Sequence, residues 1–306
     1  MEYIYSLFDT KISEETAITV GKFDGVHKGH SLLTGAILEK KKQGLKACII
    51  TFTNSVRAEI AGDNSPSLIT NKERELMLEQ MGIDYLIECP FDERLMKTSP
   101  RDFVRFLVEN LNMKYMVSGS DFTFGYKGEG NPDFLFQAAD SFGFEYQMID
   151  KIKKEERDIS STYIREELSK GHIKACNEML GYKYFVWGQV VHGAHLGHKI
   201  GIPTINILPE KDKLVPKFGV YVTTIDLDGR VYHGVTNVGV KPSVTDDKVL
   251  GIETHILDYK GNLYGRFVKV TFEEFLRAEQ RFNSIDELKN QMAIDKKVAK
   301  DYFNNL

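Results

Sequence analysis

Cysteine is scarce in this chain of 306 residues, which contains only three. Cys48, Cys89 and Cys176 stand far apart and form no C-x-x-C pair. Because of this spacing, the sequence indicates neither a disulfide framework nor a cysteine-rich metal site. The pattern is typical of a protein in a reducing compartment, and we expect a cytoplasmic location.

Long apolar runs and an excess of positive charge are also lacking. No run approaches the roughly 18 apolar residues that span a bilayer, and the opening residues 1–5 do not begin a signal peptide. The formal net charge is -4 and the pI is near 6.1, so the chain has no global basic field. We therefore expect neither a membrane nor a nucleic acid as its main partner, and phosphate sites have to be local.

The chain is longer than a usual single domain, so we expect two domains, and its 42% of hydrophobic residues is that of a globular protein. In its first half, apolar strands alternate with helical patterns. Expected strands are 16–20, 47–52, 85–89 and 115–118, and expected helices follow the first strand and span 71–81 and 100–111. This alternation predicts a doubly wound parallel sheet that binds ligands beyond the carboxyl ends of its strands.

The strongest local signal is the stretch 20–30, which reads VGKFDGVHKGH. It joins a β-branched strand to a helical pattern through a glycine turn. Such a junction presents unpaired backbone N–H groups and the positive end of a helix dipole, which suits a phosphate. His27 and His30 stand three residues apart, so both rings project to one side and can donate to one phosphoryl group. Gly29 between them is expected to let the phosphate approach closely.

This arrangement suits attack on the α-phosphate of a nucleoside triphosphate. A nucleophile that is already an anionic phosphate needs no strong base, so the protein has to position it and stabilise charge on the reacting group. Without its context, H-x-x-H is more often a surface pair or two zinc ligands. The flanking glycines and the strand-to-helix setting favour the phosphate site.

The stretch 20–30 is similar to the signature of the prokaryotic bifunctional riboflavin kinase/FMN adenylyltransferases, or FAD synthetases, within the H-x-G-H nucleotidylyltransferases. The resemblance implies an α/β chain with a Rossmann-like nucleotidylyltransferase domain over 1–181. A small antiparallel β-barrel riboflavin-kinase domain with a terminal helix would follow over 182–306. The residues that it makes catalytic are His27 and His30, and those that it assigns to the nucleotide are Gly21, Phe23, Asp24 and Gly25.

A second segment of the resemblance reads GSDFTFG and spans 119–125. It follows a predicted strand, so it lies at the ligand edge of the sheet. The resemblance assigns it to the flavin and nucleotide pocket through Asp121 and Phe124. The alternative is an aromatic loop that only packs.

A third segment, ISSTYIR at 159–165, precedes an amphipathic helix. Hydroxyls at such a position normally serve as helix caps. The resemblance instead has them bind ATP phosphates, together with a planar bidentate donor one turn on. The residues concerned are Ser160, Ser161, Thr162 and Arg165.

One segment departs from the family pattern. At 51–56 the chain reads TFTNSV, where the family commonly has Thr-Phe-Asp-Pro-His-Pro. The loop faces the ligand by topology. Its lost acidic, imidazole and proline groups therefore bear on the efficiency of adenylyl transfer or on the identity of the adenylated substrate.

After Gly181 the pattern changes to short β-rich runs separated by turn signals, which predict a small antiparallel barrel. The expected strands are 185–191, 219–225, 231–238, 252–257 and 263–272. A final helix starts at Ser284, where Glu287 completes a capping box. Its expected apolar side comprises Ile285, Leu288, Met292 and Val298.

The barrel contains the letters H-x-G-H again, at 195–198, but glycine and proline interrupt the segment that follows, so we reject a second nucleotidyl site. A Walker loop, G-x-x-x-x-G-K-[ST], is also absent. The segment resembles the glycine-rich loop and Pro-Thr-Ala-Asn motif of riboflavin kinases, with Ile205 in place of alanine. By that resemblance Gly197 and Gly201 bind ATP, and Thr204 and Asn206 hold Mg²⁺ and the ATP phosphates.

Phosphorylation of a ribityl alcohol uses a neutral nucleophile, so a carboxylate within reach is valuable as a base. Glu253 lies in a segment like the Glu-Thr-His segment of the family and is the candidate, although a Glu that alternates with Ile is usually only solvent-facing. Lys241 stands where the family has arginine; lysine keeps the charge but loses the fork, so any bidentate contact there would weaken. Arg277 matches a family segment near the flavin, or pairs with Glu279 on the surface.

The sequence thus indicates a bifunctional transferase: riboflavin and ATP give FMN and ADP, and FMN and ATP give FAD and diphosphate. We expect Mg²⁺ to serve both reactions. The rival hypotheses are a chain with only one active domain, and a flavin-binding sensor with no activity. Self-association is left open.

Overall fold

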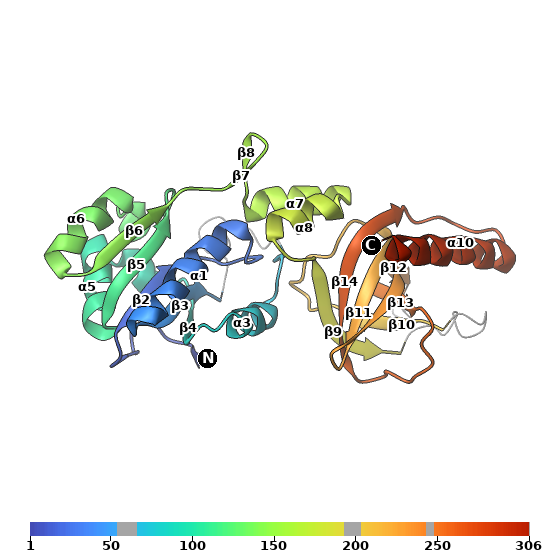
Figure 1. Ribbon diagram of the computed structural model, residues 1–306, viewed down its shortest axis with the longest axis horizontal. Helices are drawn as coiled ribbons and strands as arrows, with labels where there is room; N and C mark the ends of the chain where they lie inside the picture. Colours follow the sequence, from blue (N-terminus) through green and yellow to red (C-terminus); the bar gives the residue numbers. More distant parts are fainter. Residues whose placement is uncertain (54–65, 193–202, 243–247, 306) are drawn as a thin grey trace. The chain divides into compact units, whose positions relative to one another are not determined.

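The computed structural model describes residues 1–53, 66–192, 203–242 and 248–305 (Figure 1). It separates into two compact units, Met1–Ser160 and Ser161–Leu306. The expected fold class is confirmed, because the first unit holds a parallel sheet covered by helices and the second a closed barrel with a terminal helix. The division lies ahead of the boundary expected after Gly181, because a helix pair before that point packs with the barrel unit.

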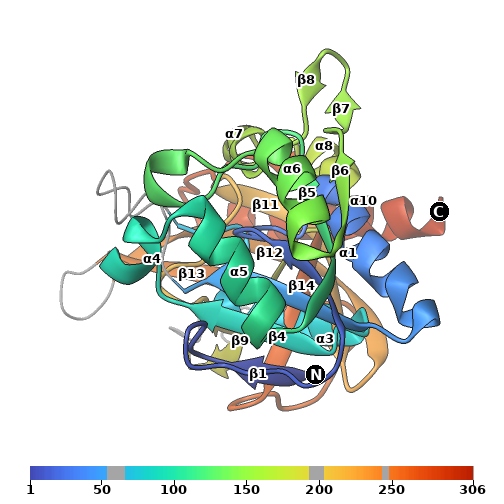
Figure 2. The same ribbon diagram turned by 90° about the vertical axis from the view of Figure 1, so that its left-hand side faces the viewer.

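Six parallel strands form the sheet of the first unit, in the order β1-β4-β3-β2-β5-β6. Figure 2 turns this unit towards the viewer, with the edge strand β1 near the bottom and β6 towards the top. The strands are β1 (Glu2–Ile4), β2 (Thr16–Val20), β3 (Lys46–Phe52), β4 (Tyr85–Cys89), β5 (Met113–Gly119) and β6 (Glu145–Ile149). The sequence predicts the four inner strands, which are apolar because both of their faces are covered. It does not indicate the edge strands β1 and β6, whose residues are mostly exposed or half-buried.

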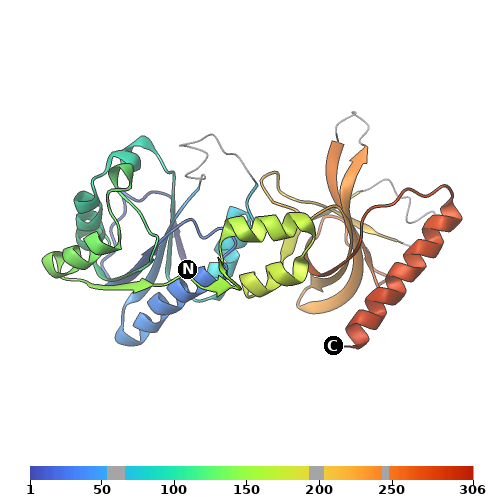
Figure 3. The ribbon, with the colours of Figure 1, turned by 90° about the horizontal axis from the view of Figure 1, so that it is seen from above.

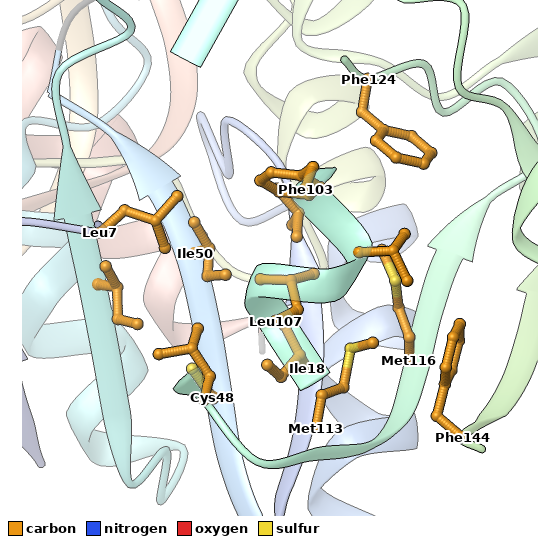
Figure 4. Close-up of a cluster of buried hydrophobic side chains, with 14 of the residues drawn as sticks. Leu7, Ile18, Cys48, Ile50, Phe103, Leu107, Met113, Met116, Phe124 and Phe144 are labelled. Carbon is orange, nitrogen blue, oxygen red and sulfur yellow. The ribbon is translucent and has the colours of Figure 1, made fainter. Parts of the chain in front are cut away.

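Helices cover both faces of this sheet, as a doubly wound fold requires. They are α1 (Lys28–Lys40), α3 (Asn71–Gln80), α4 (Glu93–Lys97), α5 (Pro100–Asn110) and α6 (Pro132–Phe142), with 3₁₀ turns at Lys41–Gln43 and Tyr126–Gly128. Helices α1 and α3 share one buried cluster with Ala17 and Ile49, while α5 and α6 share another with Ile18 and Ile50 (Figure 4). Neighbouring strand residues point to opposite faces, which explains this division.

A short antiparallel hairpin, β7 (Lys153–Lys154) and β8 (Arg157–Asp158), ends the first unit. The second unit opens with the helices α7 (Ser161–Lys170) and α8 (Ile173–Leu180). Helix α8 is fixed to the barrel because the side-chain amide of Asn177 accepts from the Tyr184 N–H at 2.7 Å and donates to the Phe272 carbonyl at 3.0 Å.

The barrel closes in the order β10-β13-β12-β11-β14-β9, with every pair antiparallel. Its strands are β9 (Phe185–Val191), β10 (Ile205–Leu208), β11 (Gly219–Leu227), β12 (Arg230–Pro242), β13 (Lys248–Ile256) and β14 (Phe267–Arg277). Inside it, the hydroxyls of Thr223, Thr236 and Thr254 form a chain of 2.8 Å hydrogen bonds and are fully buried. Because side chains alternate, Glu253 beside Thr254 faces out of the barrel.

The terminal helix α10 (Ile285–Asn304) packs on strands β11 and β12 (Figure 3). Ser284 caps it by accepting from the Glu287 N–H at 3.1 Å, but the Glu287 carboxylate accepts from the Asn283 N–H, so the expected capping box is displaced by one residue.

The expected apolar side of α10 is partly wrong. Ile285 and Val298 are 57% and 44% exposed. The buried positions are Asp295 and Ala299. A hydrophobicity pattern does not identify Asp295 as a core residue, because its burial depends on an ion pair with the barrel.

The N-terminus of α3 provides a test of the fold. Thr70 accepts from the Glu73 N–H at 3.2 Å, and the Glu73 carboxylate accepts from the Thr70 N–H at 2.9 Å, with both residues buried. Because Thr70→Ala removes this cap, we expect it to destabilise α3 by about 1 to 2 kcal/mol, measured by hydrogen exchange of the α3 amides. The control Ser141→Ala, at an exposed position of α6, should leave exchange in α3 unchanged. Equal protection of α3 in both variants would contradict the capping role.

Candidate functional site

The turn between β2 and α1 forms the first site, and its backbone is unusual. Phe23, Gly25 and Val26 have φ angles of 49°, 85° and 36°. A β-branched residue rarely adopts a positive φ, so the Val26 backbone is strained, as is common at functional sites. The Gly21 N–H donates to the Ile50 carbonyl of β3 at 3.0 Å, which fixes the start of the turn to the sheet.

The two histidines lie together at the end of this turn. Their rings stack with centroids 3.8 Å apart and an interplanar angle of 20°. The Phe23 ring, which is fully buried, packs against the His30 ring at 4.9 Å. The expectation that both rings project to one side is thus confirmed.

Gly29 has a role in the packing of the turn. A Cβ on Gly29 would lie 3.2 Å from the Cε1 and Nδ1 atoms of His27. The glycine therefore makes room for the His27 ring, and the close approach of a phosphate at Gly29 stays a prediction.

Burial keeps both imidazoles neutral. It lowers the pKa of His27 to about 4, partly opposed by the Asp24 carboxylate. Burial, together with the neighbouring His27 and Arg74, holds the pKa of His30 well below its usual value. In the described part of the chain, neither Nδ1 atom has a hydrogen-bond partner, and His27 is an N-cap whose side chain makes no capping bond. The head of α1 therefore presents polar groups that are suited to an anionic ligand.

Asp24 is buried, and its carboxylate accepts hydrogen bonds from backbone N–H groups of the protein. Its Oδ1 accepts from the Leu68 N–H at 2.8 Å and more weakly from the Ile69 N–H. This places the carboxylate between the turn and the segment that leads into α3. The assignment of Asp24 to the nucleotide stays a prediction, and these contacts give it a structural role as well.

Behind the turn lies a buried charged group that the sequence analysis missed. The Arg74 guanidinium of α3 lies 2.9 Å from the Glu88 carboxylate of β4, and both side chains are at most 4% exposed. Tyr3 of β1 donates its hydroxyl to Glu88. The available signal was Glu88 itself, a carboxylate within a strand that is otherwise apolar and buried on both faces.

The segment 119–125 lies at the carboxyl end of β5, as expected. The Asp121 carboxylate pairs with the Lys151 ammonium at 2.7 Å. Phe124 is 9% exposed and belongs to the apolar cluster of Figure 4, where it stacks on Phe122 with centroids 5.4 Å apart. The structure thus gives Phe124 a packing role, and its assignment to the flavin stays a prediction.

The expected phosphate-binding residues are divided between the two units. Ser160 ends the first compact unit, and Ser161, Thr162 and Arg165 belong to the first turns of α7 in the second. Their role with ATP stays a prediction. Gly197, Gly201 and residues 54–56 of the divergent segment lie outside the described residues.

The second site is a pocket of about 300 Å³ between the outer wall of the barrel and α10. Asn206 of β10, Glu253 of β13 and Asn237 of β12 are direct partners across three strands, so they share one face of the sheet. Glu253 and Asn237 line the pocket, with Thr204, which donates to the Glu253 carboxylate at 2.6 Å. Apolar side chains complete the lining, among them Val220, Val235, Phe282, Leu288 and Met292.

His255 lines the same pocket and was not among the expected site residues. Burial lowers its pKa, partly opposed by a hydrogen bond with the Pro203 carbonyl. The His255 Nδ1 lies 2.8 Å from that carbonyl oxygen, which can only accept, so Nδ1 carries the proton and Nε2 of the neutral ring is an acceptor.

Arg277 borders the pocket, but its guanidinium is engaged by the protein. Its Nε and Nη2 donate to the buried Asp295 carboxylate of α10 at 3.0 and 2.7 Å, and Nη1 donates to the Ala278 carbonyl. Glu279 accepts instead from the Asn237 amide at 3.3 Å, so the suggested surface pair of Arg277 and Glu279 is not formed. This geometry makes Arg277 an anchor for α10 as a wall of the pocket, and its contact with the flavin stays a prediction.

Two further features of the described residues bear on a zinc site and on a membrane location. No group of three or more His, Cys, Asp or Glu side chains in them could hold a metal ion, so the two histidines have no third partner for a zinc site there. None of the helices in the described ranges has both the length and the apolar character to cross a membrane.

Comparisons with known proteins divide the chain in the same order. A model of the FAD synthetase family matches residues 9–163, and a model of the riboflavin kinase family matches residues 180–303. Among curated proteins, the chain is 35% identical to a bifunctional riboflavin kinase/FMN adenylyltransferase of Bacillus subtilis, over 96% of both chains. It is 35% identical to that of Escherichia coli K12, over 95% of this chain and 93% of the other.

A solved structure resembles the whole chain. It is described as a macrolide-efflux protein from Streptococcus pneumoniae, and it matches with a TM-score of 0.87 and 27% identity over 98% of both chains. The arrangement of a parallel-sheet unit followed by a barrel unit is thus shared by another protein.

The neutral state of His27 provides a direct test. Its pKa in the folded chain lies below the ordinary 6.5, so the unfolded chain binds more protons between about pH 6.5 and pH 4. We therefore expect the free energy of unfolding to fall as the pH drops through this window, and less steeply in His27→Gln. In NMR, the His27 ring should titrate near pH 4, and a midpoint above pH 6 would refute its buried, neutral state.

Proposed function

The chain belongs to the family of bifunctional riboflavin kinase/FMN adenylyltransferases, and we propose that the imidazoles of His27 and His30 serve one of its reactions and the Glu253 carboxylate the other. It phosphorylates riboflavin to FMN with ATP and adenylates FMN to FAD with a second ATP. Adenylylation belongs to the N-terminal part and phosphorylation to the C-terminal part, in the order of the family models.

The observation that carries the first assignment is the stacked pair of the buried His27 ring and the half-buried His30 ring at the N-terminus of α1. In adenylylation, a phosphate oxygen of FMN forms a bond to the α-phosphorus of ATP, and the bond between the α-phosphorus and the bridging oxygen breaks to release diphosphate. No proton has to leave the nucleophile. A neutral imidazole can donate one N–H, so the pair can hold the charge that develops on the reacting phosphoryl group.

The turn contributes backbone. A Cβ on Gly21 would lie 3.3 Å from the Phe23 ring, so glycine at this position leaves room for that ring, and the first N–H groups of α1 have no side-chain cap. The Phe23 ring packs against the His30 ring, with the ring centroids 4.9 Å apart. We assign the triphosphate to this N-terminus because the backbone N–H donors and the positive end of the helix dipole both lie there.

In the kinase reaction, Glu253 is the base. It takes the proton of the terminal ribityl hydroxyl as that oxygen bonds to the γ-phosphorus of ATP, and ADP leaves. Its bond with Thr204 fixes the carboxylate at the mouth of the pocket. The apolar lining opposite Glu253 suits a ring system, with α10 as one wall.

Magnesium fits the oxygen donors at this place. Asn206 of β10 is paired with Glu253 of β13, and Thr204, which lies two residues before Asn206, donates to the Glu253 carboxylate. Hard oxygen ligands of these kinds are those that Mg²⁺ prefers. We assign Thr204 and Asn206 to the metal and its bound phosphates. The ion would neutralise charge on the ATP phosphates when bound.

A cytoplasmic location agrees with the cysteines. Cys48, Cys89 and Cys176 are free and buried. Burial also raises the pKa of Cys89 to about 12, so its thiol is unreactive at neutral pH. We propose the cytoplasm as the compartment in which the chain works.

Two variants test the division of labour. Glu253→Gln should lower FMN formation from riboflavin by roughly 10² to 10⁴-fold, the usual loss for a general base, and leave adenylylation of supplied FMN intact. His30→Ala should do the reverse. Chromatography of riboflavin, FMN and FAD with Mg-ATP measures both steps. Loss of both activities in either folded variant would contradict the division, and flavin binding without ATP consumption by the parent chain would indicate a sensor.

Two glycines of α1 form a matched pair for the histidine geometry. A Cβ on Gly29 meets the His27 ring at 3.2 Å, whereas a Cβ on Gly35 has nothing within 4 Å. Alanine favours a helix over glycine at both positions by about 1 kcal/mol. Gly29→Ala should therefore lower adenylylation roughly tenfold or more without loss of stability, while Gly35→Ala keeps full activity. Equal activities would mean that the His27 ring position does not matter.

A further inference from the structure

The buried ion pair behind the turn has no part in either reaction as described so far. The Arg74 side chain is 4% exposed and the Glu88 side chain 1%. Charged residues are rarely buried to this extent, because removing a charge from water costs several kcal/mol. An energetic cost of this kind at a phosphate site calls for an explanation in terms of the site.

The contacts of Arg74 connect it to the turn between β2 and α1. Its Nη2 lies 2.9 Å from a Glu88 oxygen and 3.0 Å from the Asn71 side-chain oxygen. Its Nη1 approaches the Lys22 carbonyl at 3.5 Å, and Lys22 directly precedes Phe23, whose ring supports His30. The Thr51 hydroxyl of β3 donates to the same carbonyl at 3.0 Å. Arg74 is therefore part of the support of the turn.

Arg74 also retains an unused donor. In the described part of the chain its buried Nε has no hydrogen-bond partner, and neither has the Nδ1 of His30. Glu88 does not fully surround the cation, since its second oxygen accepts from the Tyr3 hydroxyl. Proximity to Glu88 and burial raise the pKa of that hydroxyl, so Tyr3 stays a neutral donor.

We propose that Arg74 is a positioning residue for adenylyl transfer, which holds the Lys22 carbonyl and places a fixed positive charge beside the histidine pair, while Glu88 limits that charge. The inference rests on the proposed function, because it acts through His27 and His30 as the phosphate-binding groups. The groups around His30 are the His27 ring at the N-cap of α1, the Phe23 ring of the turn, Arg74 on α3 and, beyond Arg74, Glu88 on β4 and Tyr3 on β1, while the Asp24 carboxylate acts on His27.

The fixed charge of Arg74 should make the affinity of the site for ATP less dependent on pH. An arginine keeps its charge at every physiological pH, whereas a histidine loses its charge near pH 6.5. With Arg74 present, protonation of His30 is disfavoured, and the positive charge that attracts the triphosphate is carried by a group that does not titrate. Affinity for ATP in adenylylation should therefore be nearly constant between pH 6 and pH 8.

The test compares Arg74→Met with Glu88→Gln, two changes of opposite charge within one ion pair. Arg74→Met should raise the pKa of His30, measured by NMR, and raise the KM for ATP in adenylylation several-fold, with an acquired pH dependence. Glu88→Gln should lower the pKa of His30 further and leave the KM for ATP equal or lower. Arg74→Lys, which keeps the charge but not the fork, should restore the flat pH profile.

A structural role alone would weaken the site in the same direction in both variants, and that result, or an unchanged His30 titration in Arg74→Met, would overturn the proposal. If Arg74→Met does not fold, the double variant Arg74→Met/Glu88→Gln removes both charges, and His30 should again titrate at higher pH than in the parent chain. The riboflavin kinase activity of the same molecules should stay unchanged. Full adenylylation activity in His30→Ala would overturn the proposed function itself. If His30→Ala loses adenylylation but the His30 titration is unchanged in Arg74→Met, only this inference is overturned.

Discussion

The close stacking of two neutral imidazoles at the N-terminus of α1 is the constraint on which the first site depends. It requires a helix start without a side-chain cap, a glycine over which the His27 ring can lie, and a buried phenylalanine beneath His30. These requirements are met by one turn in which three of four successive residues, Phe23, Gly25 and Val26, have a positive φ. The parallel sheet supports the turn, because β3 and the segment before α3 both bind its backbone or its aspartate.

The second site, the pocket between the barrel and α10, suits a different reaction. The alcohol of riboflavin has to lose a proton, and the barrel pocket contains the Glu253 carboxylate. The phosphate of FMN has no proton to lose, and the turn at the sheet presents two neutral imidazoles with the Arg74 cation behind them. Alternation along β13 sends Thr254 into the hydroxyl chain inside the barrel and Glu253 out to the pocket. The Arg277–Asp295 pair then fixes α10 as the opposite wall.

Much of this could be predicted from the sequence, because the relevant signals are local. The strand Thr16–Val20 and the strand Tyr85–Cys89 are found at the expected residues, since a parallel strand buried on both faces has to be continuously apolar. The histidine pair follows from its spacing on a helix. The fold class follows from the alternation of elements in one half and the short strands in the other.

What the sequence could not give depends on partners distant in the chain. Asp295 interrupts an apolar helix face, and its burial follows only from Arg277, a residue of another element. Glu88 needs both Arg74 and Tyr3 to be tolerated in the sheet. The role of Gly29 depends on the rotamer of His27, which no spacing rule specifies. Periodicity identifies elements, whereas a buried charge is explained only by the groups that pair with it.

The central claim is that the histidine pair binds the triphosphate. A crystal structure of the chain with a non-hydrolysable ATP analogue and FMN tests it most directly. The account predicts a ring nitrogen of both His27 and His30 within hydrogen-bond distance of phosphate oxygens at the N-terminus of α1. Phosphates bound elsewhere, with the two rings still stacked and without a phosphate contact, would contradict it.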